Sequence, residues 1–170
     1  MDLKDKIRSI ENYPQEGVIF RDSTTLLKDA DGMREAIDAI QKPLEGLDFD
    51  LVLGPESRGF IFGMPVAYNL GKGFVPVRKK GKLPAEVISK EYALEYGTAT
   101  IEMHKDAVQP GQKVVIVDDL LATGGTANAI VEMVEEIGAQ VVALAFLIEL
   151  DFLGGRKALP GRRIETVIHY

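Results

Sequence analysis

The stretch Val114-Val115-Ile116-Val117-Asp118-Asp119-Leu120-Leu121-Ala122-Thr123-Gly124-Gly125-Thr126 decides the fold, because it joins an apolar strand, two carboxylates and a glycine-rich turn. Its first four residues are β-branched and follow the turn pair Pro110-Gly111, a pattern typical of an interior strand in a parallel sheet that is covered on both faces. The next helix is predicted to begin near Thr126. We therefore expect the chemistry at the carboxyl end of this strand.

The turn after this strand is suited to a phosphate group. Gly124-Gly125 lets the backbone curl closely around an anion, and the first amides of the predicted helix point into the curl. Thr123 and Thr126 add hydroxyl donors. Asp118-Asp119 would repel a bare phosphate, so we expect these carboxylates to meet sugar hydroxyls or a hydrated magnesium ion. A phosphate beside a diol indicates a ribose 5-phosphate.

Each of these motifs alone also has a purely structural interpretation. Gly-Gly after a strand is often only a tight turn, and Asp-Asp is often only a helix cap, but their joint occurrence after an apolar strand favours a ligand site. The sequence contains no G-x-x-x-x-G-K-[ST] motif, and no G-x-G-x-x-G motif follows a strand. This argues against a P-loop NTPase and a dinucleotide-binding Rossmann domain.

The length and composition predict one domain over residues 1–170, and the alternation of predicted helices and strands predicts the α/β class. The chain is 46% hydrophobic and 27% charged, which is enough for a single core. It has no Cys, which excludes disulfides and thiolate metal sites. With no apolar targeting segment and a net charge of −6, we expect a cytoplasmic protein that binds neither nucleic acid nor a membrane.

The apolar pattern alternates between helices and strands. It predicts helices over residues 3–10, 33–44, 59–69 and 126–137, and strands over residues 51–53, 73–77, 113–117, 141–148 and 164–168. This alternation is typical of a mostly parallel sheet flanked by helices. Residues 13–22 are predicted to be irregular. Residues 78–100 break the rhythm and predict a flexible lid, with some β-ribbon character toward its end.

Residues 115–126, V-I-V-D-D-L-L-A-T-G-G-T, resemble the signature of the type I phosphoribosyltransferases, which use phosphoribosyl pyrophosphate (PRPP). Further segments are similar to the members of this family that act on adenine: G-V-I-F-R-D at 17–22, G-P-E-S-R-G-F at 54–60, R-K-K-G-K-L-P at 78–84 and L-E-Y-G at 94–97. They occur in the family's order, so the resemblance covers nearly the whole chain. It implies the type I fold with a small N-terminal hood, mainly residues 1–30 with C-terminal contributions, and a homodimer.

The resemblance implies a role for each segment. Asp118 and Asp119 would contact the ribose hydroxyls, and the 5-phosphate would be held by Ala122, Thr123, Gly124, Gly125 and Thr126. The pyrophosphate would be held by Glu56, Ser57, Arg58, Arg78, Lys79 and Lys82, in a loop that often has a non-proline cis bond in this family. Magnesium is the expected cofactor, held mainly by PRPP and water, so no protein residue is assigned as a metal ligand.

Adenine would be held by Ile19, Phe20, Arg21 and Leu150. Phe20 can stack on a flat base, and the backbone groups of its neighbours can read the base edge. By resemblance, Glu95 is the catalytic carboxylate and Tyr96 helps the lid to close the site. A carboxylate can relay a proton to or from a ring nitrogen. His104 and His169 are predicted to be structural.

The expected reaction is therefore the condensation of adenine with PRPP to AMP and pyrophosphate, as in purine salvage. One alternative is a PRPP-sensing regulator, but such proteins carry an added DNA-binding segment, for which we expect no room here. A second alternative is an enzyme for 6-oxopurines, which would be expected to present a side-chain donor to the base. The segment G-V-I-F-R-D favours adenine.

Overall fold

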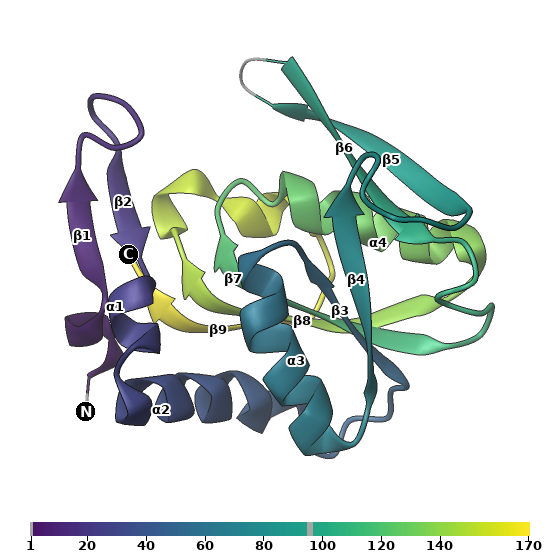
Figure 1. Cartoon of the computed structure of the whole chain (residues 1–170), viewed down its shortest axis with the longest axis horizontal. Coiled ribbons are helices and arrows are strands. Elements are labelled where there is room, and N and C mark those ends of the chain that lie inside the picture. The colour runs from purple at the N-terminus through teal and green to yellow at the C-terminus, as the bar shows by residue number, and fades with distance from the viewer. Residues whose placement is uncertain (1, 95–96) are drawn as a thin grey trace.

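Within residues 2–94 and 97–170, which the computed structural model describes, the central sheet has seven strands in the order β5-β6-β4-β3-β7-β8-β9 (Figure 1). Its core is parallel, because β3 pairs in parallel with β4 and β7, and β8 pairs in parallel with β7 and β9. The strands are β3 (Leu51–Pro55), β4 (Gly73–Lys79), β5 (Val87–Leu94), β6 (Gly97–His104), β7 (Lys113–Leu121), β8 (Gln140–Glu149) and β9 (Ile164–His169). The predicted α/β class with a mostly parallel sheet is confirmed.

Helices cover both faces of this sheet (Figure 1). Alternate side chains of β7 show the two layers: Val114 and Ile116 pack on the side of α4, whereas Val115 and Val117 pack on the side of α2 and α3. All four are fully buried, so β7 is the interior strand that its sequence predicts. The helices are α1 (Thr24–Leu27), α2 (Ala30–Gln41), α3 (Arg58–Leu70) and α4 (Gly125–Ile137), with short 3-10 turns η1 (Leu3–Lys6), η2 (Lys42–Leu44), η3 (Asp151–Leu153) and η4 (Gly155–Ala158).

The strand β7 is longer than predicted. It continues to Leu121 in register with β8, so Asp118 and Asp119 lie within the strand and not after it. The helix α4 starts at Gly125, one residue before the predicted start, and Gly138 in the left-handed conformation ends it.

The N-terminal segment forms a small two-stranded sheet of β1 (Arg8–Glu11) and β2 (Ile19–Asp22), which we call the hood. The helix predicted over residues 3–10 is wrong beyond its first turn, and residues 13–22, predicted as irregular, end in a strand. Antiparallel pairing of β1 with β2 overrides the local helical pattern. The hood lies beside the end of β9 (Figure 1).

The predicted lid is mostly strand. β5 and β6 pair along their whole length as an antiparallel hairpin, and β6 joins the sheet through Arg78 opposite Glu102 and Lys79 opposite Ile101. The β-ribbon is therefore longer than predicted, because backbone pairing onto a sheet edge requires no continuous apolar pattern. Glu95 and Tyr96 lie outside the described residues. Among the described residues, none of the helices has the length and apolar character that a membrane crossing requires.

Candidate active site

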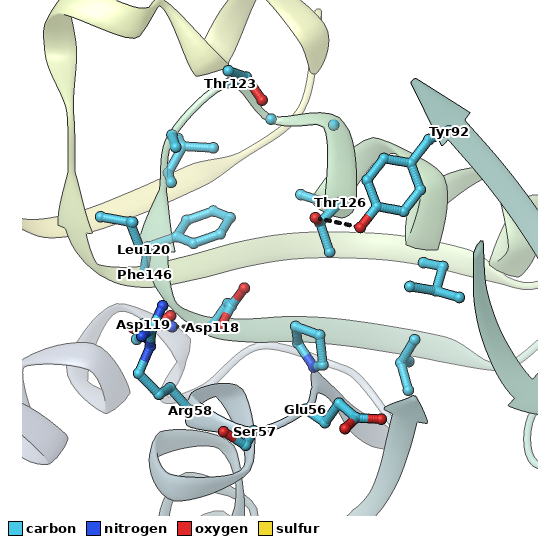
Figure 2. Close-up of a pocket in the computed structure, with 18 of the residues that line it drawn as sticks. Glu56, Ser57, Arg58, Tyr92, Asp118, Asp119, Leu120, Thr123, Thr126 and Phe146 are labelled. Carbon is cyan, nitrogen blue, oxygen red and sulfur yellow. Dashed lines mark hydrogen bonds and ion pairs between the residues drawn. The ribbon is translucent and has the colours of Figure 1, made fainter. Parts of the chain in front are cut away.

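The carboxyl ends of β3 and β7 meet at one edge of the sheet, because these strands are parallel neighbours. A cavity of about 430 Å³ lies there, between the loop after β3 and the loop after β7. Figure 2 shows Glu56, Ser57 and Arg58 on one side, Thr123 and Thr126 on the other, and the aspartates between them. The end of β4 and Tyr92 of β5 complete the lining. Sites at the carboxyl edge of a parallel sheet are typical of α/β proteins.

Asp118 and Asp119 form the floor between the two loops. The backbone N–H of Asp119 donates to the Oδ1 of Asp118 over 2.7 Å, and Nε of Arg58 lies 2.5 Å from the Oδ2 of Asp119. Burial, and then the charge of Asp119, raise the pKa of Asp118 well above its ordinary value. One cation therefore balances two neighbouring carboxyl groups, which can accept hydrogen bonds from a diol or from water around a cation.

The shape of the loop after β7 depends on close packing around Gly124. Gly124 has a φ of +85°, and a Cβ placed on it would lie 2.6 Å from the carbonyl oxygen of Gly155 and 2.9 Å from the Cβ of Ala158. Only glycine fits this position. Gly124 caps α4, so the first amides of the helix face the cavity, as an anion requires. Thr123 and Thr126 line the cavity, as predicted for a phosphate loop.

The loop after β3 is shaped by charged side chains. The peptide bond between Glu56 and Ser57 is cis. The Oε1 of Glu56 accepts from the backbone N–H of Lys79 over 2.7 Å and from Nε of Arg78 over 3.3 Å. The Lys79 hydrogen bond in particular keeps the pKa of Glu56 below its ordinary value. Glu56 thus fixes the end of β4 and orients Arg78.

Three of the four predicted basic residues line the cavity: Arg58, Arg78 and Lys79. The fourth, Lys82, lies in an exposed loop outside the lining, where its backbone N–H donates to the carbonyl of Lys79. The strand β4 brings Arg78 and Lys79 to the same edge as β3, because the two strands are parallel neighbours.

A second cavity of about 140 Å³ adjoins the first and shares Arg58, Asp119 and Leu120 with it. Its walls are mostly apolar, which suits a flat base. The predicted Ile19, Phe20, Arg21 and Leu150 all line it, and so do Val18, Leu120 and Ile148, which the sequence analysis did not single out. The guanidinium carbon of Arg58 lies 5.8 Å from the centre of the Phe20 ring.

Arg21 turns its side chain away from this second cavity. Its Nη1 donates to the hydroxyl of Ser9 over 2.6 Å, and its guanidinium lies 4.0 Å from the centre of the Tyr170 ring. Tyr170 also binds the backbone beside Leu150, since its N–H donates to the carbonyl of Glu149 and its carbonyl accepts from the N–H of Asp151. Tyr170 therefore ties the two walls of this cavity together. No local motif marked it.

Tyr92 is the second residue that the sequence analysis missed. The hydroxyl of Tyr92 lies 3.0 Å from that of Thr126 (Figure 2). Tyr92 belongs to β5, a strand within the segment that was predicted to be the lid. One signal was present: Ile88, Lys90 and Tyr92 alternate and so share one face of a strand.

The histidines make contacts within the fold, in line with a structural role. Nε2 of His104 accepts from the N–H of Ala85 over 3.4 Å, and Nδ1 of His169 lies 2.8 Å from Asp151. Glu149 joins His169 and Asp151 in a group whose ligand atoms lie within 4.8 Å of one another. Arg156 already neutralises Glu149, with Nε and Oε2 2.9 Å apart, so this group is an ion-pair network. Magnesium fits better at the larger cavity, where Asp118 and Asp119 can accept hydrogen bonds from the water shell of a hydrated ion.

The phosphoribosyl transferase domain family matches residues 23–162. The chain is 60% identical to an adenine phosphoribosyltransferase of Lachnoclostridium phytofermentans, over 99% of this chain and 97% of that protein. A crystal structure of the enzyme from Thermoanaerobacter pseudethanolicus is similar at a TM-score of 0.96 and 55% identity, covering 99% and 98% of the two chains. The Saccharomyces cerevisiae enzyme, solved with adenine and an iminoaltritol bisphosphate, is similar at a TM-score of 0.91 and 40% identity, covering 98% and 96%.

Proposed function

This chain belongs to the adenine phosphoribosyltransferases of the phosphoribosyl transferase family, and we propose that its two adjoining cavities carry out the transfer from PRPP to adenine. The observation that carries the proposal is the shared wall: Arg58, Asp119 and Leu120 belong to both cavities. A ribose in the larger cavity would present its C1 to a base in the smaller one. The products are AMP and pyrophosphate.

The ribose 5-phosphate half of PRPP is assigned to β7 and the loop after it. The amides at the start of α4, together with Thr123 and Thr126, would hold the 5-phosphate. Asp118 and Asp119 would accept hydrogen bonds from the 2- and 3-hydroxyls. The carboxylate charge also favours the positive charge that develops on the ribose ring as the bond from C1 to pyrophosphate breaks.

The pyrophosphate half is assigned to the loop after β3 and the end of β4. Arg58, Arg78 and Lys79 line the cavity and would balance the charge of the departing group, with Ser57 as a further donor and Glu56 orienting Arg78. Lys82 would have to reach in from its exposed loop. Magnesium, when bound, supplies further positive charge to the pyrophosphate, and Asp118 and Asp119 are the carboxylates placed to hold its water shell.

Adenine is assigned to the smaller cavity. Phe20 and Leu150 would cover its two faces, and the backbone groups of Ile19 and Arg21 would read its edge. As N9 bonds to C1, the base loses its N9 proton. We assign Glu95 to relaying a proton to or from a ring nitrogen of the base, because L-E-Y-G matches the family. Tyr96 is assigned to closing the site. Exclusion of water prevents hydrolysis of PRPP.

We also propose that the enzyme works as a cytoplasmic homodimer. Ile61, Met64 and Tyr68 are exposed at 43%, 51% and 84%, and their spacing places them on one side of α3. Such an apolar face is suited to a second copy. Light scattering after gel filtration should give a dimer for the native protein and a monomer for Met64→Glu; a native monomer would contradict the proposal.

The activity is tested by turnover with PRPP and magnesium and each of adenine, hypoxanthine, guanine and xanthine. We expect turnover with adenine, because no side-chain donor of the kind expected for a 6-oxopurine reader is assigned to the base edge. Preference for another base would overturn the assignment of adenine as the substrate. Binding of PRPP without turnover of any base would indicate a regulator. Glu95→Leu should lower kcat far more than PRPP affinity, and an unchanged kcat would remove Glu95 from the reaction.

A further inference from the structure

The hairpin of β5 and β6 is fastened along α4, and it brings one hydroxyl to the phosphate loop. Ile88, Lys90 and Tyr92 point from the same face of β5 toward this helix. Ile88 packs on the core under α4. Nζ of Lys90 lies 2.7 Å from Glu136 and 3.3 Å from Glu132. The same face therefore carries an apolar contact, an ion pair and Tyr92.

Tyr92 lies over the first turn of α4. Its Cδ2 is 3.5 Å from the position that a Cβ on Gly125 would take, which is ordinary van der Waals contact. Its hydroxyl and that of Thr126 are hydrogen bonded at 3.0 Å, and both side chains line the larger cavity (Figure 2). The pair thus stands where the 5-phosphate is assigned.

The chemistry of hydroxyls fixes the direction of this hydrogen bond when a phosphate is bound. A hydroxyl has one proton to donate, and a phosphate oxygen only accepts. In this structure the hydroxyl of Thr126 donates to that of Tyr92. Thr126 can donate to a phosphate and keep this hydrogen bond only if the direction reverses, so that its oxygen accepts from Tyr92. Tyr92 has no such conflict, because its phenol can donate its own proton to Thr126.

We propose that Tyr92 is a positioning residue for the 5-phosphate, acting through Thr126. Its hydroxyl donates to the Oγ1 of Thr126 and so directs the threonine proton toward the phosphate. This inference rests on the proposed function, and in particular on the assignment of the 5-phosphate to the loop after β7.

Tyr92→Phe tests it, because the ring that packs on Gly125 is kept and only the hydroxyl is lost. Calorimetric titration with ribose 5-phosphate should show Kd raised about three- to tenfold, as expected for one lost hydrogen bond. In turnover assays the KM for PRPP should rise with it, while the KM for adenine stays within about twofold. An unchanged Kd and KM for PRPP would overturn the proposal.

Two further variants separate the hydrogen bond from a general loosening of the hairpin. Lys90→Ala removes the ion pair with α4 but leaves Thr126 untouched, so it should leave the Kd for ribose 5-phosphate within about twofold. In a Thr126→Val background, Tyr92→Phe should have no further effect. If Lys90→Ala lost as much affinity for ribose 5-phosphate as Tyr92→Phe, action through Thr126 would be contradicted. Additive losses of affinity in the double variant of Tyr92→Phe and Thr126→Val would contradict it as well. Native protein that does not use adenine would instead refute the proposed function.

Discussion

The loops after β3 and β7 leave neighbouring parallel strands at the same edge of the sheet, and each opens a helix of 13 residues. The β7 loop is formed by glycine backbone and hydroxyl groups, with Gly124 closely packed against Gly155. The β3 loop depends on charges held by other elements, since Arg58 pairs with Asp119 and Glu56 binds the end of β4. The same strand-loop-helix arrangement is thus built in two ways, one by close backbone packing and the other by ion pairs between elements.

Under the proposed function, this difference divides PRPP between two kinds of site. The 5-phosphate is assigned to the loop in which a Cβ on Gly124 would clash with Gly155. The pyrophosphate, which has to leave, is assigned to the loop with the cationic side chains. The following changes test the division, from the largest expected effect to the smallest.

Gly124→Ala should have the largest effect. The alanine would have to adopt a φ of +85°, and its Cβ would lie 2.6 Å from the carbonyl oxygen of Gly155. We therefore expect a loss of about 2–5 kcal/mol of unfolding free energy. Ribose 5-phosphate should bind at least about tenfold more weakly. Thermal unfolding and calorimetry measure both. Gly111→Ala is the matched control, because Gly111 has the same φ with nothing within 4 Å of the added Cβ; it should lose only about 1–2 kcal/mol and bind normally. Equal effects would show that the close packing of the loop is unimportant.

Arg58→Gln should affect turnover more than stability. It removes the cation that pairs with Asp119 and is assigned to the pyrophosphate. A hydrogen bond from a charged group contributes about 1.5–3 kcal/mol. Its loss should therefore lower kcat/KM for PRPP by about 10- to 150-fold. Arg163→Gln, which removes an exposed pair with Glu165 at 3.1 Å, is the control and should retain normal kinetics. If Arg58→Gln kept native kcat/KM, the ion-paired loop would have no part in PRPP use.

The pH dependence of ribose 5-phosphate binding tests Asp118. Its pKa is raised, chiefly by burial, so the carboxylate that accepts from the ribose takes up a proton at higher pH than an ordinary aspartate would. As the pH falls through this pKa, Kd should rise several-fold in the native protein and less in Asp118→Asn. The phosphate of the ligand titrates in both proteins and cancels in their difference. Parallel Kd curves for the two proteins would contradict the role of Asp118.

Asp22→Asn should have the smallest effect on either loop, because Asp22 lies in the hood. Hydrogen bonds from Thr24, and then Arg8, lower its pKa from 3.8 to about 2. The group therefore stabilises the hood above pH 4, and this contribution is lost as the pH falls toward 2. At pH 7 the variant should lose about 1–3 kcal/mol of unfolding free energy and raise the KM for adenine but not for PRPP. The difference in stability should shrink as the pH falls through the folded pKa of about 2 and disappear below it. A change in PRPP affinity of equal size would show that the hood is coupled to both loops.

The same contrast explains what could be predicted from the sequence. The β7 strand, the phosphate turn and α4 are contiguous, so their pattern and chemistry could be recognised together. The contacts of Glu56 with Lys79, of Tyr92 with Thr126 and of Tyr170 with Arg21 join residues that are distant in the chain, and no local pattern marks them. The secondary structure of residues 3–22 was mispredicted for the same reason, since β1 and β2 become strands only by pairing with each other.

The most direct test of the division is to titrate ribose 5-phosphate and magnesium pyrophosphate separately into Gly124→Ala and Arg58→Gln. We predict that Gly124→Ala loses affinity for ribose 5-phosphate and keeps that for pyrophosphate, and that Arg58→Gln does the reverse. Equal loss of both ligands in both variants, with the fold intact by circular dichroism, would contradict the account.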